Sequence, residues 1–231
     1  GFGAALAIIN DGNYLTIMFS AFGFSLLTVA IVYLVSKKTK GNKLLGLILS
    51  GIIVSSLFGA GTSFIKLVAD PSDQLPAITY WLMGSLSGTT RQTVAMSVIP
   101  MAIGLVPLFL VRWRINVLTL GDEEARTMGI NATRLRFLII IFATLVTSAS
   151  VAVSGMIGWV GLVVPHLARR LVGNNYRYLM PASMLTGAIF LLIVDNISRN
   201  LLQTEIPIGI LTAFVGAPFF VYLMTRRGEV Y

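Results

Sequence analysis

The 231-residue chain has no cysteine and a single histidine, His166. Without cysteine, the chain forms no disulfide and offers no thiolate ligand to a metal ion. A catalytic zinc site takes about three protein ligands, so one histidine does not indicate a metal centre. We interpret His166, in Val164-Pro165-His166-Leu167, as a histidine at a helix end or at an interface.

The motifs of ATP hydrolysis and of intramembrane proteolysis are also missing. No glycine-rich phosphate loop with a lysine is present, so we do not expect the chain itself to hydrolyse ATP. Ser154-Gly155 lacks a flanking nucleophile motif, and the apolar segments contain no facing pair of aspartates. We therefore expect a protein that is not an enzyme and that carries no cofactor.

Charged residues are scarce: they make up 11% of the chain, whereas 56% of it is hydrophobic. A soluble domain carries about 25% charged residues. Seventeen basic and nine acidic residues cannot cover a soluble surface of this size, so the apolar surplus faces lipid. The net charge of +8 is dispersed in short clusters between apolar runs, which does not indicate a nucleic-acid partner.

Seven apolar segments predict membrane-spanning helices, because a hydrocarbon core of about 30 Å takes roughly 17–25 helical residues. The fold class that we expect is an all-α, polytopic transmembrane bundle. Gly1–Ile9 is too short to span and predicts the tail of an earlier helix, and since the chain opens without methionine we expect a missing upstream part. No linker is visible, so we expect one domain over 1–231. The seven segments are Leu15–Val35, Leu44–Phe64, Val94–Val111, Phe137–Val153, Met156–Val172, Pro181–Leu202 and Ile208–Met224.

The basic residues of the connections predict an orientation. Fourteen of the 17 lysines and arginines fall in alternate connections, and the other three are Lys66, Arg91 and Arg199. Cytoplasmic loops carry the lysine and arginine excess, so the first set of connections and the C-terminus are expected in the cytoplasm. That set comprises 36–43, 112–136, 169–181 and 225–231.

The outer connection 66–93 predicts a short interfacial helix around Tyr80 and Trp81. The cytoplasmic segment 116–134 is polar and predicts two short helices broken at Gly129. Leu120, Ala125 and Met128 form a small apolar face among acidic residues, with nothing of its own to bury against.

Such a face fits a groove on a soluble partner, and a solvated loop is the alternative. The candidate residues of this loop are Leu120, Gly121, Asp122, Glu123, Glu124, Ala125, Met128 and Gly129.

The segment Leu44–Phe64 carries small residues at four-residue spacing. This spacing lets helices approach closely, so tight packing is one interpretation. The other interpretation is the wall of a translocation pathway, because its hydroxyl groups are weakly polar and bear no charge that would trap a solute. The candidate pathway residues are Ser50, Ser55, Ser56, Thr62 and Ser63.

Asp195 and Arg199 are four residues apart and therefore share a helix face. They predict either a structural ion pair near the outer interface or an arginine that faces an acidic partner.

Five stretches, which run in the same order across nearly the whole chain, resemble the FecCD family of binding-protein-dependent permeases for iron-siderophores, haem and cobalamin. The stretches are Tyr80–Ser85, Glu123–Ala125 with Gly129, Gly158–Arg169, Glu205–Gly209 and Gly216–Phe220.

The resemblance implies the permease fold of type II ATP-binding-cassette (ABC) importers, with about ten membrane helices of which these seven would be the last. It implies that the loop from Leu120 to Gly129 couples to a separate ATPase subunit. Arg199 would meet an acidic residue of an extracytoplasmic solute-binding protein. The segment Leu44–Phe64 would line the pathway, and Trp81, Met83 and Gly84 would belong to the outer gate.

The expected function is that of the permease subunit of a metal-chelate importer in a bacterial or archaeal cell membrane. A second permease subunit, identical or related, would complete the pathway. The alternative is a secondary transporter or channel, which predicts charges at mid-membrane depth that the sequence does not show. Copurification of an ATPase subunit in mild detergent discriminates between the two. The sequence leaves open which chelate is carried.

Overall fold

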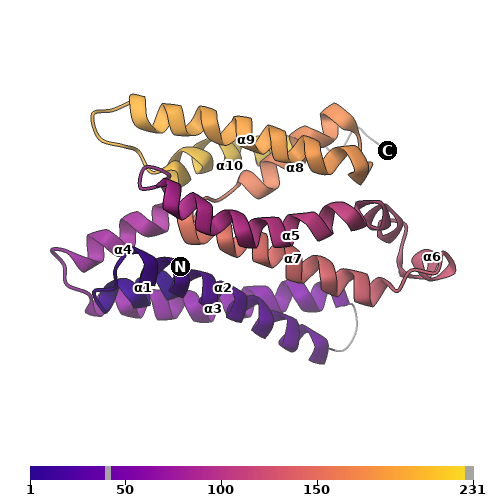
Figure 1. The fold of residues 1–231 in the computed structure, drawn as a ribbon, viewed down its shortest axis with the longest axis horizontal. Helices are drawn as coiled ribbons and strands as arrows, with labels where there is room; N and C mark the ends of the chain where they lie inside the picture. Colours follow the sequence, from indigo (N-terminus) through magenta and orange to yellow (C-terminus); the bar gives the residue numbers. More distant parts are fainter. Residues whose placement is uncertain (40–42, 227–231) are drawn as a thin grey trace. The chain divides into compact units, whose positions relative to one another are not determined.

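The computed structural model describes residues 1–39 and 43–226, and this part of the chain is helical without any strand (Figure 1). The all-α prediction is confirmed. Lys40, Arg227 and the C-terminal end that we predict in the cytoplasm lie outside the described residues. The helices are α1 (Phe2–Ile9), α2 (Tyr14–Lys38), α3 (Lys43–Val68), α4 (Gln74–Met83), α5 (Arg91–Leu118), α6 (Asp122–Thr127), α7 (Ala132–Ser154), α8 (Val160–Val172), α9 (Tyr176–Asn200) and α10 (Ile208–Arg226).

Five of the seven predicted spans are helices long and apolar enough to cross a membrane. They are Tyr14–Lys38, Leu45–Val68, Arg91–Leu118, Ala132–Ser154 and Tyr176–Asn200. Each runs a few residues beyond the apolar segment at one or both ends, because polar and charged residues continue the helix there. A sixth, α10, is apolar over the shorter stretch Ile208–Tyr222. The chain is therefore a multi-pass membrane protein.

The helix predicted over Met156–Val172 is shorter than its apolar segment. The helix begins only at Val160 and has 13 residues, about 20 Å of helix against a core of about 30 Å. Gly155 and Trp159 have φ angles of 66° and 67°, so the backbone leaves the helical conformation on both sides of 156–158. Hydropathy does not register this break because its residues are themselves largely apolar.

The described chain packs as two compact units. The first comprises Gly1–Leu82, Thr89–Ala102 and Thr144–Gly155. In it, the short helix α1 packs on both α2 and α3, and its alanines are almost fully buried. The Phe2 ring lies 5.2 Å from Phe24 and 5.4 Å from Phe58, between ring centroids. As predicted, α1 is too short to span.

The second unit comprises Met83–Gly88, Ile103–Ala143 and Met156–Tyr231. Here α8 packs on α9, and α10 packs on both. Three non-helical segments meet in it: the one after α4, the one before α8 and the one before α10. Gly209 lies so close to the carbonyl oxygens of Met83 and Met156 that a side chain there would overlap the Met83 oxygen. That the two units form one functional domain stays a prediction.

Gly209→Ala is expected to lower the thermal stability of the purified subunit in detergent. The added methyl group would displace the Met83 backbone, and such overpacking costs about 1–3 kcal/mol. The matched control is Gly51→Ala, since no atom lies within 4 Å of a methyl group built there. The control should keep or slightly raise the melting temperature, because alanine is the better helix former by about 1 kcal/mol. Equal melting temperatures for the two variants would contradict this packing.

Candidate functional site

The predicted cytoplasmic loop connects α5 to α7 and carries one short helix, α6, in place of the two that we predicted. The residues expected to form a second short helix after Gly129 are instead the turn 129–131 and the first turn of α7. Asp122, Glu123 and Glu124 form the first turn of α6, where negative charge is favourable to the helix dipole. Figure 1 shows α6 beyond the ends of α5 and α7.

The end of α6 is a Schellman motif built on Gly129. The Ile130 amide donates to the Ala125 carbonyl at 2.9 Å, and the Gly129 amide donates to the Arg126 carbonyl at 2.9 Å. These two bonds require a left-handed residue at the helix end, and Gly129 has a φ of 76°. Glycine takes this conformation without strain, which explains its place in the loop.

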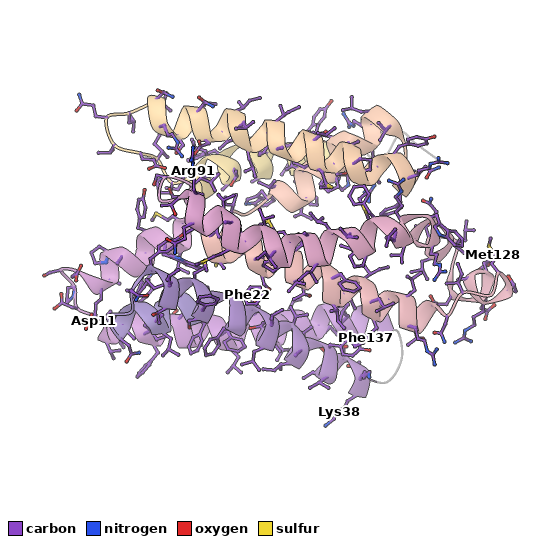
Figure 2. All side chains as sticks on the ribbon, viewed as in Figure 1. Asp11, Phe22, Lys38, Arg91, Met128 and Phe137 are labelled. Carbon is purple, nitrogen blue, oxygen red and sulfur yellow. The ribbon has the colours of Figure 1, made fainter. Side chains whose placement is uncertain are left out.

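The Schellman motif turns part of the predicted apolar face inward. Ala125 is fully buried against Val117 and Ala132, with Ile130 packed beside them. The prediction that Leu120, Ala125 and Met128 form one exposed face is therefore wrong, since the turn folds the chain back over Ala125. Leu120 and Met128 remain 63% and 59% exposed, and Figure 2 shows Met128 at the end of the loop. The loop 119–131 is therefore folded around α6 and packs on a small core of its own. We call this loop the α6 knob.

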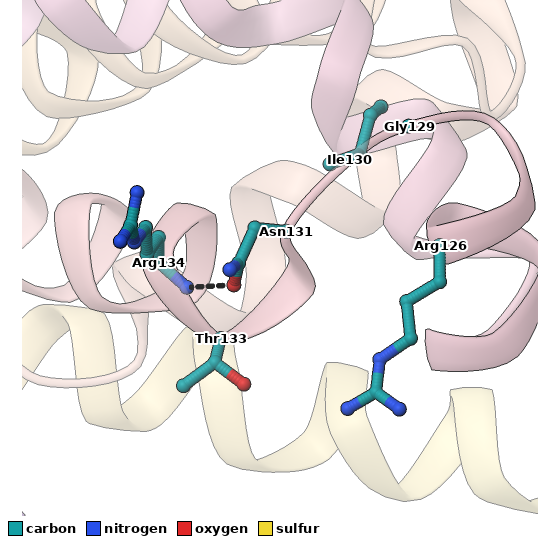
Figure 3. Close-up of a pocket in the computed structure, with 6 residues that line it drawn as sticks. All are labelled: Arg126, Gly129, Ile130, Asn131, Thr133 and Arg134. Carbon is teal, nitrogen blue, oxygen red and sulfur yellow. Dashed lines mark hydrogen bonds between the residues drawn. The ribbon is translucent and has the colours of Figure 1, made fainter.

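Polar contacts fix the knob on α7. Arg136 donates to Asp122, with Nη2 to Oδ1 at 2.7 Å. Both side chains are more than 40% exposed, so the ion pair contributes about 0–1 kcal/mol. Beside it is a hollow of about 530 Å³, lined by Arg126, Gly129, Ile130, Asn131, Thr133 and Arg134. Figure 3 shows this hollow, including the bond from the Arg134 amide to the Asn131 side chain.

Of the three predicted gate residues, Gly84 makes the most specific contacts. It has a φ of 73°, it is buried, and its carbonyl accepts a 2.9 Å hydrogen bond from the Ile208 amide. Met83 lies at the end of α4 and is 36% exposed. Trp81 packs against the core of the first unit. A short helix, α4, is present where the interfacial helix was predicted, and its place at the membrane interface stays a prediction.

The sequence did not reveal the residues that hold the Gly84 segment. Ser85 donates to the Glu205 carboxylate, with Oγ to Oε1 at 2.9 Å. The fully buried Ser198 donates to the Ile206 carbonyl and accepts from the Ile206 amide through its own carbonyl. These residues lie far apart in the chain. Ser85 and Glu205 fall in stretches that carry the family resemblance, but the sequence did not show that they meet.

Asp195 and Arg199 form the predicted ion pair, with Nε to Oδ2 at 2.9 Å. The Asp195 side chain is 18% exposed and the Arg199 side chain 45% exposed. Arg199 therefore leaves part of its side chain exposed while Asp195 holds it in place. Its role in docking a binding protein stays a prediction.

The five candidate pathway residues of α3 do not share one face. Ser50 is buried, at 2% exposure, on the same side as Val54 and Ile65. The exposed members are Ser55, Ser56 and Ser63, and Thr62 is half-buried. His166 lies inside α8, where its Nδ1 is 2.9 Å from the Leu162 carbonyl oxygen, one turn back on the same helix.

Comparison with known proteins identifies relatives over almost the whole chain. Residues 1–226 match the model of the FecCD transport family. The molybdate import system permease protein MolB of Haemophilus influenzae is 41% identical over 98% of this chain and 68% of its own length. A probable iron chelatin transport system permease protein of Helicobacter pylori is 38% identical over 100% of this chain and 69% of its own. The chain thus spans about two thirds of these relatives.

A solved structure has the same fold. It is an inward-facing conformation of a metal-chelate type ABC transporter, with a TM-score of 0.91 and 40% sequence identity. The match covers 97% of this chain and 72% of that one.

Ala125→Leu should unfold the knob locally, because the larger side chain does not fit the closed space between Val117 and Ala132. Amide hydrogen exchange over residues 122–130 would measure the effect, and we expect at least a tenfold loss of protection, which corresponds to about 1.4 kcal/mol. Thr127→Leu adds bulk to an exposed position of the same helix and should leave protection unchanged. Unchanged protection in Ala125→Leu would contradict the buried placement of Ala125.

Proposed function

The chain belongs to the FecCD transport family, and on that premise we propose that it serves as the membrane permease of an ABC importer for an iron-siderophore or a related metal chelate, such as haem or cobalamin. The observation that carries the proposal is the match to a metal-chelate ABC transporter over 97% of the chain at 40% identity. The iron chelatin relative supports the same class of cargo. The permease supplies a path through the membrane, and a separate subunit hydrolyses ATP.

The charge distribution disfavours the alternative of a secondary transporter or channel. Ion-coupled transporters place ionisable groups near the bilayer midplane. In the five candidate spans, all charged residues lie within about two turns of a helix end, and the Asp195–Arg199 pair is in the last two turns of α9. A mechanism driven from outside the membrane fits this pattern better.

We assign the knob around α6 to docking on the ATPase subunit. Its internal core leaves Leu120 and Met128 exposed beside Glu123 and Glu124. A folded knob presents these side chains without an ordering cost when the partner binds. Movement of the ATPase subunits would then displace α6 together with the ends of α5 and α7, which share its core.

If α6 docks on the ATPase, the orientation, the pathway and the outer gate are assigned as follows. The loop of α6 and the C-terminus lie in the cytoplasm, and Arg199 faces an extracytoplasmic solute-binding protein. Ser55, Ser56 and Ser63 on the exposed face of α3 line a pathway completed by a second permease subunit, identical or related. Trp81, Met83 and Gly84 belong to the outer gate.

Glu123→Lys and Gly129→Ala are expected to uncouple import from ATP hydrolysis in the complete transporter. The first variant reverses a charge on the exposed side of α6, and the second strains the left-handed end of the Schellman motif by about 1–2 kcal/mol. We expect at least a tenfold fall in ATP-driven uptake by proteoliposomes, with normal insertion of both variants. For Glu123→Lys we also expect loss of the copurified ATPase subunit.

The matched control is Asp73→Lys, which makes the same charge reversal at an exposed position next to α4. It should retain both uptake and the copurified ATPase. Normal import by Glu123→Lys and Gly129→Ala would show that the coupling assignment is wrong.

The cargo has its own test, because the two relatives named above carry different solutes. We expect the partner binding protein to bind an iron-siderophore, haem or cobalamin in a titration and to ignore molybdate. Binding of molybdate alone would overturn the chelate assignment and leave the permease assignment intact.

A further inference from the structure

Asn116, in the last turn of α5, joins this helix to the start of α9. Its Nδ2 donates to Asn175 Oδ1 at 2.9 Å, and its Oδ1 accepts from the Tyr176 amide at 2.8 Å. Asn175 Oδ1 also accepts from the Arg177 amide at 3.0 Å, which caps α9. We call this arrangement of Asn116 and Asn175 the asparagine clasp.

The direction of the clasp is fixed by the backbone. An amide N–H only donates, so the atoms that receive the Tyr176 and Arg177 amides must be the side-chain oxygens of Asn116 and Asn175. The nitrogen of Asn116 therefore points at the oxygen of Asn175, and the reverse arrangement would leave both backbone amides, those of Tyr176 and Arg177, facing donors.

On one side the clasp is attached to the α6 knob. Asn116 immediately precedes Val117, which packs on Ala125 and Ala132. The Asn116 carbonyl also accepts from the amide and hydroxyl of Thr119, in the turn that leads to α6. A displacement of α6 therefore moves the last turn of α5, where Asn116 lies.

On the other side the clasp is attached to the gate segment through α9. This helix has 25 residues, about 37 Å of length, and Figure 1 shows it as one long helix. Near its far end, the buried Ser198 binds Ile206, whose neighbour Glu205 binds Ser85. The Ile208 amide then binds the Gly84 carbonyl. Hydrogen bonds at both ends of α9 thus connect the knob to the segment after α4.

We propose that Asn116 is a positioning residue that makes α9 follow the α6 knob, so that displacement of the knob by an ATPase reaches the Gly84 segment. The inference rests on the proposed docking of α6. It attributes the coupling between the knob and the Gly84 segment to the hydrogen bonds of Asn116 and to α9.

Two substitutions of equal size and charge separate this role from a general loss of stability. Asn116→Asp places an oxygen opposite Asn175 Oδ1, which already accepts from Arg177, so the interhelical bond is replaced by repulsion. Asn175→Asp keeps an acceptor for both Asn116 and Arg177, and aspartate is as good an N-cap as asparagine. The first variant should break the clasp, and the second should keep it.

The chain contains no cysteine, so spin labels can be attached at Thr127→Cys on the knob and Tyr178→Cys on α9, both exposed. The label pair is placed in the complete reconstituted transporter, with its partner subunits made cysteine-free. Pulsed electron paramagnetic resonance then measures the intrasubunit distance without nucleotide and with ATP held unhydrolysed by removal of Mg²⁺. The ATPase content of every sample is quantified first.

We expect one narrow distance that is the same with and without ATP in the parent and in Asn175→Asp, because the knob and α9 move together. In Asn116→Asp the distance should shift on the order of 1–2 Å on ATP addition, or broaden. Asn116→Ala removes both hydrogen bonds without adding charge, so it should behave in the same way as Asn116→Asp. It replaces Asn116→Asp in the test if that variant does not assemble.

An ATP-dependent shift in the parent, an unchanged distance in both Asn116 variants, or equal behaviour of Asn116→Asp and Asn175→Asp would each overturn the proposal. A parent subunit that retains no ATPase would instead show that the docking assignment, on which the proposal rests, has failed.

Discussion

Polar backbone groups in an apolar environment must find partners within the protein, and the second unit is organised by this constraint. Its helices are interrupted after α4, before α8 and before α10. The carbonyl of Gly84 accepts from the Ile208 amide, and Ser198 satisfies both polar backbone groups of Ile206. Gly209 allows these backbones to approach because it has no side chain. The non-helical segments that interrupt the helices therefore also form the hydrogen bonds that connect them.

Backbone hydrogen bonds also organise the loop between α5 and α7, which lies outside the apolar spans and is folded by itself. The left-handed Gly129 closes α6 over Ala125, and the buried contact with Val117 makes the knob continuous with α5. Asn116 extends this continuity to α9. The chain can serve an importer in this way, because its proposed task is to convert a displacement of a folded loop into a movement of helices.

Apolar segments predicted most of the fold correctly because length and hydropathy determine which stretches span a bilayer. The helix predicted over Met156–Val172 is too long, because two left-handed residues shorten an apolar run that hydropathy cannot distinguish from a helix. The prediction failed at Ala125, because the inward turn depends on the Schellman motif at Gly129, and the sequence pattern predicted only a break between two helices there. Asn116 and Asn175, 59 positions apart, meet only through tertiary packing, and nothing local marks them as partners.

The most direct measurement of the account is photo-cross-linking from the α6 knob in inverted membrane vesicles that contain the complete transporter. A benzophenone attached to Met128→Cys, the exposed end of the loop in Figure 2, should form a covalent adduct with the ATPase subunit. The same reagent at Arg91→Cys, which we place on the opposite side of the membrane, should form none. An ATPase adduct from position 91 would contradict docking of the ATPase on the α6 knob. The lack of an ATPase adduct from position 128, when the subunits copurify, would contradict it as well.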